Sequence, residues 1–139
     1  MSVYFIVNST ITDPAGLDDY VAAVGPTIAG RDMTLRVVTN EAETVEGQPA
    51  GSRVVVIEFP DRDGFRSWYD SPEYQAVIGL RLASTVGFAV LVDGVGGRAL
   101  VDVARAALPV GGAQILLQEA AKGALTWGFA VRPVSLTLR

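Results

Sequence analysis

The stretch that decides the fold joins a buried strand to two short helices: Ile57-Glu58-Phe59-Pro60, Asp61 to Phe65, and Trp68-Tyr69-Asp70-Ser71-Pro72-Glu73-Tyr74-Gln75. The strand, Arg53 to Phe59, contains an apolar run that fits a sheet covered on both faces. Ser71-Pro72-Glu73 combines a cap, a proline at the first helical position and an acid at the positive end of the helix dipole. These signals predict a sheet that packs against helices.

The rest of the first two-thirds of the chain completes this unit. Strands are predicted over Val3 to Ile11, Thr34 to Thr39 and Val86 to Val92, from their β-branched and aromatic residues. Asp13-Pro14 begins a helix that Gly30 ends. The order β-α-β-β-α-β predicts an α+β, ferredoxin-like fold with a four-stranded antiparallel sheet and helices on one side.

The other face of this sheet also carries apolar residues and therefore needs a cover. A second copy of the chain is the simplest cover, since two-fold dimers are the commonest oligomers. We therefore expect a homodimer.

The Trp-Tyr-x-Ser-Pro-x-Tyr run at 68–74, followed by Arg81, resembles a family known as domain of unknown function 1330. The resemblance covers about residues 3 to 94 and implies a dimeric α+β barrel. It implies no reaction, because the family has none assigned. One departure is Gly30-Arg31-Asp32, where members usually carry a Gly-Gly pair.

Residues 1–94 are therefore predicted to form the barrel domain and residues 95–139 a C-terminal extension, helical and then strand-like. Residues 98–139 contain five Lys and Arg against two Asp and Glu, whereas the chain as a whole has a net charge of −4. This extension is expected either to pack on the partner subunit or to be a poorly ordered appendage.

Composition excludes several classes of function. The chain has 139 residues, 50% of them hydrophobic, and fits one soluble domain with a real core. Its acidic balance argues against nucleic acid and anionic membranes as partners. Without His or Cys there is no Ser-His-Asp triad, thiolate nucleophile or zinc site of the usual kind, so we expect no cofactor and no metal. No signal peptide or membrane span is evident, which favours the cytoplasm.

Arg81 is the first candidate for chemistry, because it shares a helix face with Tyr74 and Ile78, which must turn toward the sheet. A cation there needs an anion. The anion is either the carboxylate or enolate of a small organic ligand, with Tyr69 or Tyr74 as a second donor, or a protein carboxylate such as Glu58 or Asp70. Alternatively, the Arg81 side chain extends to water at the edge of the sheet.

The remaining candidates are Glu58, a general base if desolvated, and residues that could line a pocket. Trp68, Tyr69 and Tyr74 either wall such a pocket or belong to the core. Asn8 shares a strand face with Tyr4 and Ile6 and is a candidate lining residue. The predicted catalytic set is Arg81, Glu58 and Tyr69, and the predicted ligand-binding set is Asn8, Trp68 and Tyr74.

Three functions remain open from the sequence. The protein binds or converts a small acidic or aromatic organic molecule without a cofactor, or it is a non-catalytic module that carries such a molecule, or it is a dimeric interaction protein without a ligand.

Overall fold

The computed structural model describes residues 1–97 and 102–103. Met1–Gly94 form one compact unit. Its elements are, in order, β1 (Val3–Ile11), α1 (Pro14–Ile28), β2 (Thr34–Thr39), β3 (Arg53–Phe59), α2 (Arg62–Tyr69), α3 (Pro72–Ser84) and β4 (Thr85–Asp93). The α+β, ferredoxin-like fold expected from the sequence is confirmed, with its second helical segment divided into α2 and α3. The extension predicted for residues 95–139 lies, apart from 95–97 and 102–103, outside the described residues.

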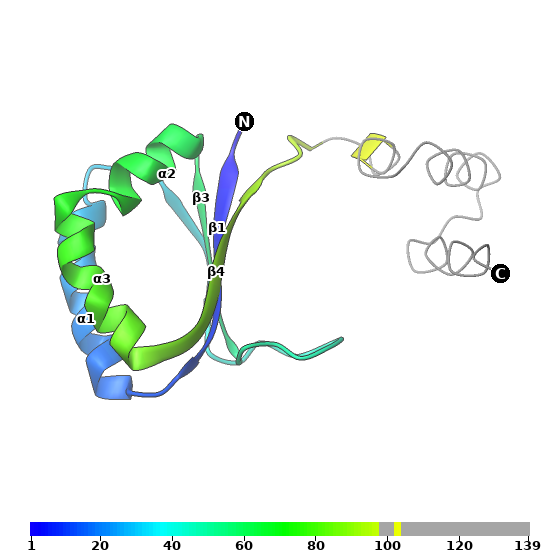
Figure 1. The fold of residues 1–139 in the computed structure, drawn as a ribbon. Coiled ribbons are helices and arrows are strands. Elements are labelled where there is room, and N and C mark those ends of the chain that lie inside the picture. The colour runs from blue at the N-terminus through cyan, green and yellow to red at the C-terminus, as the bar shows by residue number, and fades with distance from the viewer. Residues whose placement is uncertain (98–101, 104–139) are drawn as a thin grey trace, which may run out of the picture. The chain divides into compact units, whose positions relative to one another are not determined.

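The four strands form an antiparallel sheet in the order β2-β3-β1-β4, and Figure 1 shows all three helices on one side of it. In β1, Val3, Phe5, Val7 and Ser9 are buried, whereas the residues between them are only partly buried. The register places Ser9 opposite Arg53 on one side and Gly87 on the other. Alternate residues point to opposite faces, so the odd-numbered residues of β1 and β3 face the helices.

The helices begin where the capping residues predict. The Asp13 carboxylate accepts from the Gly16 amide at 3.1 Å, and the Asp61 carboxylate accepts from the Gly64 amide at 2.7 Å. The Ser71 hydroxyl accepts from the Tyr74 amide at 3.2 Å. After α1, Gly30 has a φ of +74°, the left-handed conformation that favours glycine at helix ends.

The hydrophobic core lies near α2, at one end of the layer between helices and sheet. Its buried members are Val3, Phe5, Val7, Phe59, Phe65, Trp68 and Tyr74. The Trp68 ring stacks on Phe59 with centroids 5.7 Å apart and lies 4.0 Å from the ring centroid of Tyr74. Aromatic rings thus fill this end of the layer.

The face of the sheet that points away from the helices is apolar and open in the single chain. On β4, it exposes Val86 (65%), Phe88 (53%), Val90 (42%) and Val92 (40%). We refer to this surface, with Ile6 of β1 and Val54 and Val56 of β3, as the open sheet face. Within residues 1–97 and 102–103, no helix has the length and hydropathy needed to cross a bilayer.

Candidate functional site

A cavity of about 570 Å³ lies between the helix-facing side of the sheet and helices α1 and α3. Its apolar walls are formed by Phe5, Val7, Leu17, Val21, Val24, Ile28, Met33, Leu35, Val38, Val55, Ile57 and Trp68. The polar members of its lining are Ser9, Tyr20, Arg31, Arg53, Arg81 and Thr85. An apolar cleft of this size with a few polar groups is the usual form of a small-molecule site.

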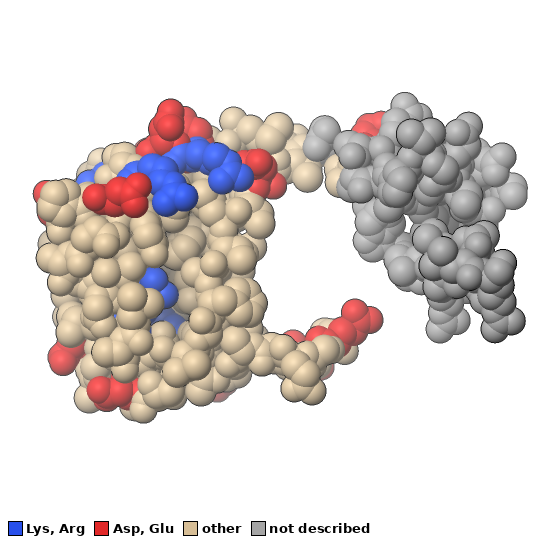
Figure 2. Space-filling model, viewed as in Figure 1, with Lys and Arg blue, Asp and Glu red and all other residues tan. Residues whose placement is uncertain are grey.

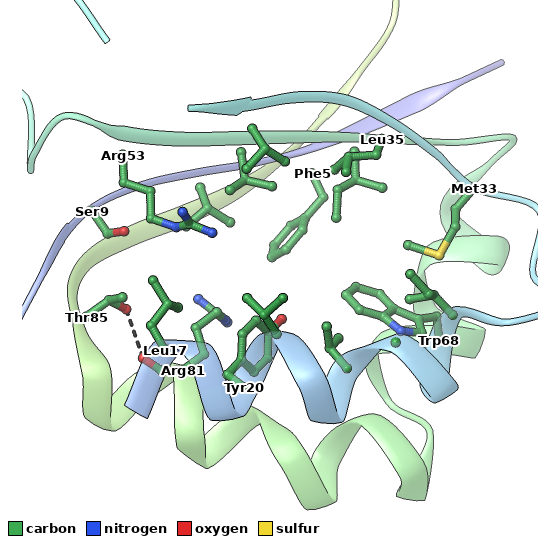
Figure 3. Close-up of a pocket in the computed structure, with 18 of the residues that line it drawn as sticks. Phe5, Ser9, Leu17, Tyr20, Met33, Leu35, Arg53, Trp68, Arg81 and Thr85 are labelled. Carbon is green, nitrogen blue, oxygen red and sulfur yellow. Dashed lines mark hydrogen bonds between the residues drawn. The ribbon is translucent and has the colours of Figure 1, made fainter. Parts of the chain in front are cut away.

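Arg81 enters the cavity from the last turn of α3. Its Nε atom is buried and finds no hydrogen-bond partner among the described residues. The alternative that Arg81 pairs with Glu58 or Asp70 is wrong, because Glu58 pairs with Arg36 and Asp70 with Arg66. The backbone oxygen of Arg81 accepts from the Thr85 hydroxyl at 2.9 Å, which ties the end of α3 to β4 (Figure 3).

Ser9 is the second buried side chain without a partner. It is 2% exposed, and its Oγ atom makes no hydrogen bond within the described residues. Figure 3 shows Ser9, Arg53, Arg81 and Thr85 at the same end of the cavity, with Ser9 and Arg53 on strands and Arg81 on the facing helix. The two buried polar atoms that lack partners, Ser9 Oγ and Arg81 Nε, therefore belong to residues that line one site.

The cavity lining is basic although the chain is acidic. Three arginines line it, and no Asp or Glu does. Arg53 donates to the Asn40 side chain at 2.6 Å, and Arg31 donates to the Thr27 carbonyl and to Ser67, each at 3.0 Å. Figure 2 shows basic atoms recessed in a largely uncharged part of the surface of Met1–Gly94. This charge pattern suits an anion.

Tyr20 brings a phenol to the cavity from α1, and its hydroxyl lies 3.2 Å from the Tyr74 hydroxyl. Burial, and then the neighbouring Tyr74, raise the pKa of Tyr20 above its ordinary value of 10.0, although the charge of Arg81 and a hydrogen bond between Arg81 and the Tyr20 side chain oppose this shift. The Tyr20 phenol is therefore protonated at neutral pH and has one hydrogen to donate, to Tyr74 or to a ligand.

The three predicted aromatic residues are placed differently. Trp68 is 1% exposed, lines the cavity, and donates from its ring nitrogen to the Thr27 hydroxyl at 3.1 Å. Tyr74 is fully buried and is not among the lining residues, but it contacts two of them, Tyr20 and Trp68. Tyr69 stacks on Phe65 with centroids 5.1 Å apart and is not among the lining residues.

Glu58 and Asn8 lie on the opposite face of the sheet from the cavity. Glu58 accepts from Arg36 at 2.6 Å. A hydrogen bond from Ser2, followed by Arg36, lowers the pKa of the Glu58 carboxyl, so its charged form is favoured. The Asn8 amide group donates to the Gly51 carbonyl at 2.8 Å and accepts from the Ala50 amide at 2.8 Å. The expectation that Asn8 lines the pocket is corrected, because its neighbour Ser9 does so instead.

The sequence reasoning did not select Ser9, Tyr20 or Arg53 for the site. Tyr20 lies at helical spacing from Leu17 and Val24, which places it on the apolar face of its helix without marking it for chemistry. Arg53 could have been found from the sequence. It begins an apolar strand and points to the same face as Val55 and Ile57, and both faces of this strand are predicted to be covered. The described residues contain no group of three or more His, Cys, Asp or Glu that could hold a metal ion.

Comparisons with known proteins agree with the fold. The family model described as Domain of unknown function (DUF1330) matches residues 2–95. A solved protein of unknown function from Rhodopseudomonas palustris has 12% identity and a TM-score of 0.57, with 68% of this chain and 82% of that chain covered. At this identity, the likeness shows the fold alone.

Two further structures are more distant in shape. SnoaB from Streptomyces nogalater, a cofactor-independent oxygenase, has 18% identity and a TM-score of 0.49, with 71% of this chain and 96% of that chain covered. A dimeric ferredoxin-like protein of unknown function from Thermobifida fusca has 17% identity and a TM-score of 0.48, with coverages of 68% and 92%. The search among curated proteins found no match.

Proposed function

Because this chain belongs to the family described as Domain of unknown function (DUF1330), for which that description names no reaction, we propose a function from its cavity. The protein binds a small organic anion between the sheet and helices α1 and α3, without a cofactor. Arg81 is the electrostatic anchor, and Ser9 and Tyr20 are hydrogen-bonding groups beside it.

A single observation carries the proposal. The two buried side-chain atoms that lack a partner among the described residues, Ser9 Oγ and Arg81 Nε, belong to residues that line the same cavity. Leaving a buried polar group unpaired costs about 1–3 kcal/mol, so native structures normally pair such groups. A carboxylate offers acceptors to both atoms and neutralises the guanidinium.

Binding is better supported than conversion. An acid–base reaction needs a base within reach of the ligand, and the lining residues include no carboxylate. Tyr20 is held in its protonated form and can donate a proton but not accept one at neutral pH. Conversion is therefore the alternative proposal, with Arg81 and Tyr20 stabilising negative charge that develops on the ligand.

The proposal is tested by titrating the full chain with benzoate, succinate and octanoate, followed by isothermal calorimetry and by amide chemical shifts. At least one of these carboxylates should bind saturably and shift the amides of Ser9 and Arg81. Arg81→Gln should weaken that binding at least tenfold, because the charged anchor is lost.

The matched control is Arg62→Gln, which removes the same charge from an exposed arginine that pairs with Asp93 outside the cavity. This variant should bind as the wild type does. The proposed function would be contradicted if Arg81→Gln bound the carboxylate as strongly as the wild type. It would also be contradicted if none of the three carboxylates bound.

We also propose that the protein is a homodimer joined through the open sheet face. The exposed apolar side chains of β4 support this arrangement, because monomers rarely expose a contiguous apolar strand face. A second copy covers it symmetrically, with the same surface on both subunits.

Phe88 is 53% exposed on the open sheet face, so Phe88→Glu places a charge in the proposed interface. This variant should be a monomer, and sedimentation equilibrium measures the change. Leu82→Glu is the control, because Leu82 is 60% exposed but lies on α3, away from that face. A wild-type chain that sediments as a monomer at high micromolar concentration would rule out this dimer.

A further inference from the structure

The polar and apolar groups of the cavity are separated along its length. Figure 3 shows Ser9, Arg81 and Thr85 at one end, and Met33, Leu35 and Trp68 at the other. Phe5 and Tyr20 lie between the two ends. A bound molecule with the same separation of character would satisfy both ends at once.

The unpaired polar atoms at one end of the cavity are shielded from solvent. Ser9 Oγ and Arg81 Nε are both inaccessible to solvent. By contrast, Leu35 and Val38 of β2 line the cavity with 60% and 52% of their surface exposed, and Val21 of α1 with 54%. Apolar side chains thus surround the opening between α1 and the edge strand β2, while the charge lies inside.

The other two arginines do not provide an equivalent second anchor. Arg31 is bonded to Thr27 and Ser67, and Arg53 to Asn40. At the Trp68 end, the indole N–H is already donated to the Thr27 hydroxyl. Among the described residues that line the cavity, only Arg81 has a buried side-chain nitrogen without a hydrogen-bond partner, and this atom favours a single carboxylate at its end of the cavity.

The span along β1 from the polar end of the cavity to Phe5 indicates the size of the molecule. Ser9 and Phe5 are four residues apart on β1, which corresponds to about 13 Å at roughly 3.3 Å per residue. A carboxylate at Ser9 therefore leaves room for an apolar body that extends along the strand to the rings of Phe5 and Trp68.

We propose that the ligand is a monocarboxylate with an apolar aliphatic or aromatic body about as long as an eight-carbon chain. Its carboxylate lies against Arg81 and Ser9, and its far end lies against Trp68 and Met33. This inference rests on the proposed function and narrows it from organic anions in general to amphiphilic monocarboxylates in one orientation.

The first test compares four probes by calorimetry on the full chain: octanoate, octan-1-ol without the charge, octanedioate with a second charge, and acetate without the body. Each buried methylene contributes about 0.8 kcal/mol, or roughly fourfold in affinity. Octanoate should therefore bind more than about 100-fold more tightly than acetate, and at least tenfold more tightly than the alcohol and the diacid.

The double variant Leu35→Ser, Val38→Ser removes apolar surface at the opening without adding charge. This double variant should weaken the binding of octanoate several-fold and leave the affinity for acetate unchanged. A variant that merely distorts the site would weaken the binding of both. Circular dichroism of the variant confirms that it is folded.

The second test reads orientation from Trp68 fluorescence in a Trp127→Phe background. Bromine quenches a nearby indole, so 8-bromooctanoate should quench Trp68 more strongly than 2-bromooctanoate. Equal quenching, or stronger quenching by the 2-bromo acid, would overturn the orientation.

The outcomes separate this inference from the proposed function. If octanedioate or acetate binds as tightly as octanoate and this binding depends on Arg81, the anion site stands and the assignment to amphiphilic monocarboxylates is wrong. If no probe binds, or if binding ignores Arg81, both proposals fall together.

Discussion

Ser9→Ala should make the unliganded protein more stable, although it deletes a buried side-chain atom. The Ser9 hydroxyl is 2% exposed and unpaired within the described residues. An unsatisfied buried hydroxyl costs about 1–3 kcal/mol, and alanine removes the hydroxyl while it keeps the Cβ. We therefore expect a gain of about 1 kcal/mol in the free energy of unfolding, or roughly 4–8 °C in Tm for a domain of this size.

The assay is urea unfolding followed by far-ultraviolet circular dichroism, with Ser71→Ala measured in parallel. The Ser71 hydroxyl caps α3 and donates to the Trp68 carbonyl at 2.6 Å, so the same chemical change there should cost about 1 kcal/mol. Changes of opposite sign are expected for the two variants. A Ser9→Ala protein that is no more stable than wild type would refute the reasoning, because the hydroxyl would then be satisfied without a ligand.

Three further outcomes follow from the packing and the charges. Phe59→Ala removes a ring that is 1% exposed, and should cost about 3–5 kcal/mol in urea unfolding; a cost below about 1 kcal/mol would contradict its place in the core. Gly87→Ala should cost more than about 2 kcal/mol, because a Cβ there collides with the backbone of β1, and an unchanged midpoint would disprove that contact. Glu58 has a folded pKa below its ordinary 4.5, so its contribution to stability is present above that pH and is lost as the pH falls through the folded pKa. In denaturant titrations, Glu58→Gln should therefore reduce the fall in the free energy of unfolding at acidic pH. An unchanged pH dependence would argue against the lowered pKa of Glu58.

The elements could be predicted because their signals are local. The strands at Thr34–Thr39 and Arg53–Phe59 have the bounds that their β-branched runs indicate. The caps at Asp13 and Ser71 fix two helix starts, since each needs only a side chain three residues from its amide partner.

The site was only partly predictable, because both faces of β1 are apolar. Tyr4 and Ile6 on one face and Phe5 and Val7 on the other are equally compatible with burial, so alternation could not tell which face the helices cover. Asn8 was chosen over Ser9 for that reason. Arg81 could be found because the helical period ties it to Tyr74 and Ile78, whose direction is fixed by burial.

The lack of a partner for Ser9 Oγ and Arg81 Nε could not be predicted from the sequence. It depends on which side chains of other elements fall within about 3 Å, and that distance is set by the packing of α1 and α3 on the sheet. Likewise, the pairing of Glu58 with Arg36 results from the register of β2 on β3, which places Glu58 opposite Thr34.

The alternation of β1 and β3 also makes the cavity and the outer surface independently adjustable. Phe5, Val7, Val55 and Ile57 all have odd numbers and all line the cavity. A combinatorial library confined to these four codons would reshape the interior and leave the exterior of the sheet unchanged. A one-residue insertion near the start of β1 would instead disturb both surfaces, because it would exchange the inward-facing and outward-facing residues along the rest of the strand.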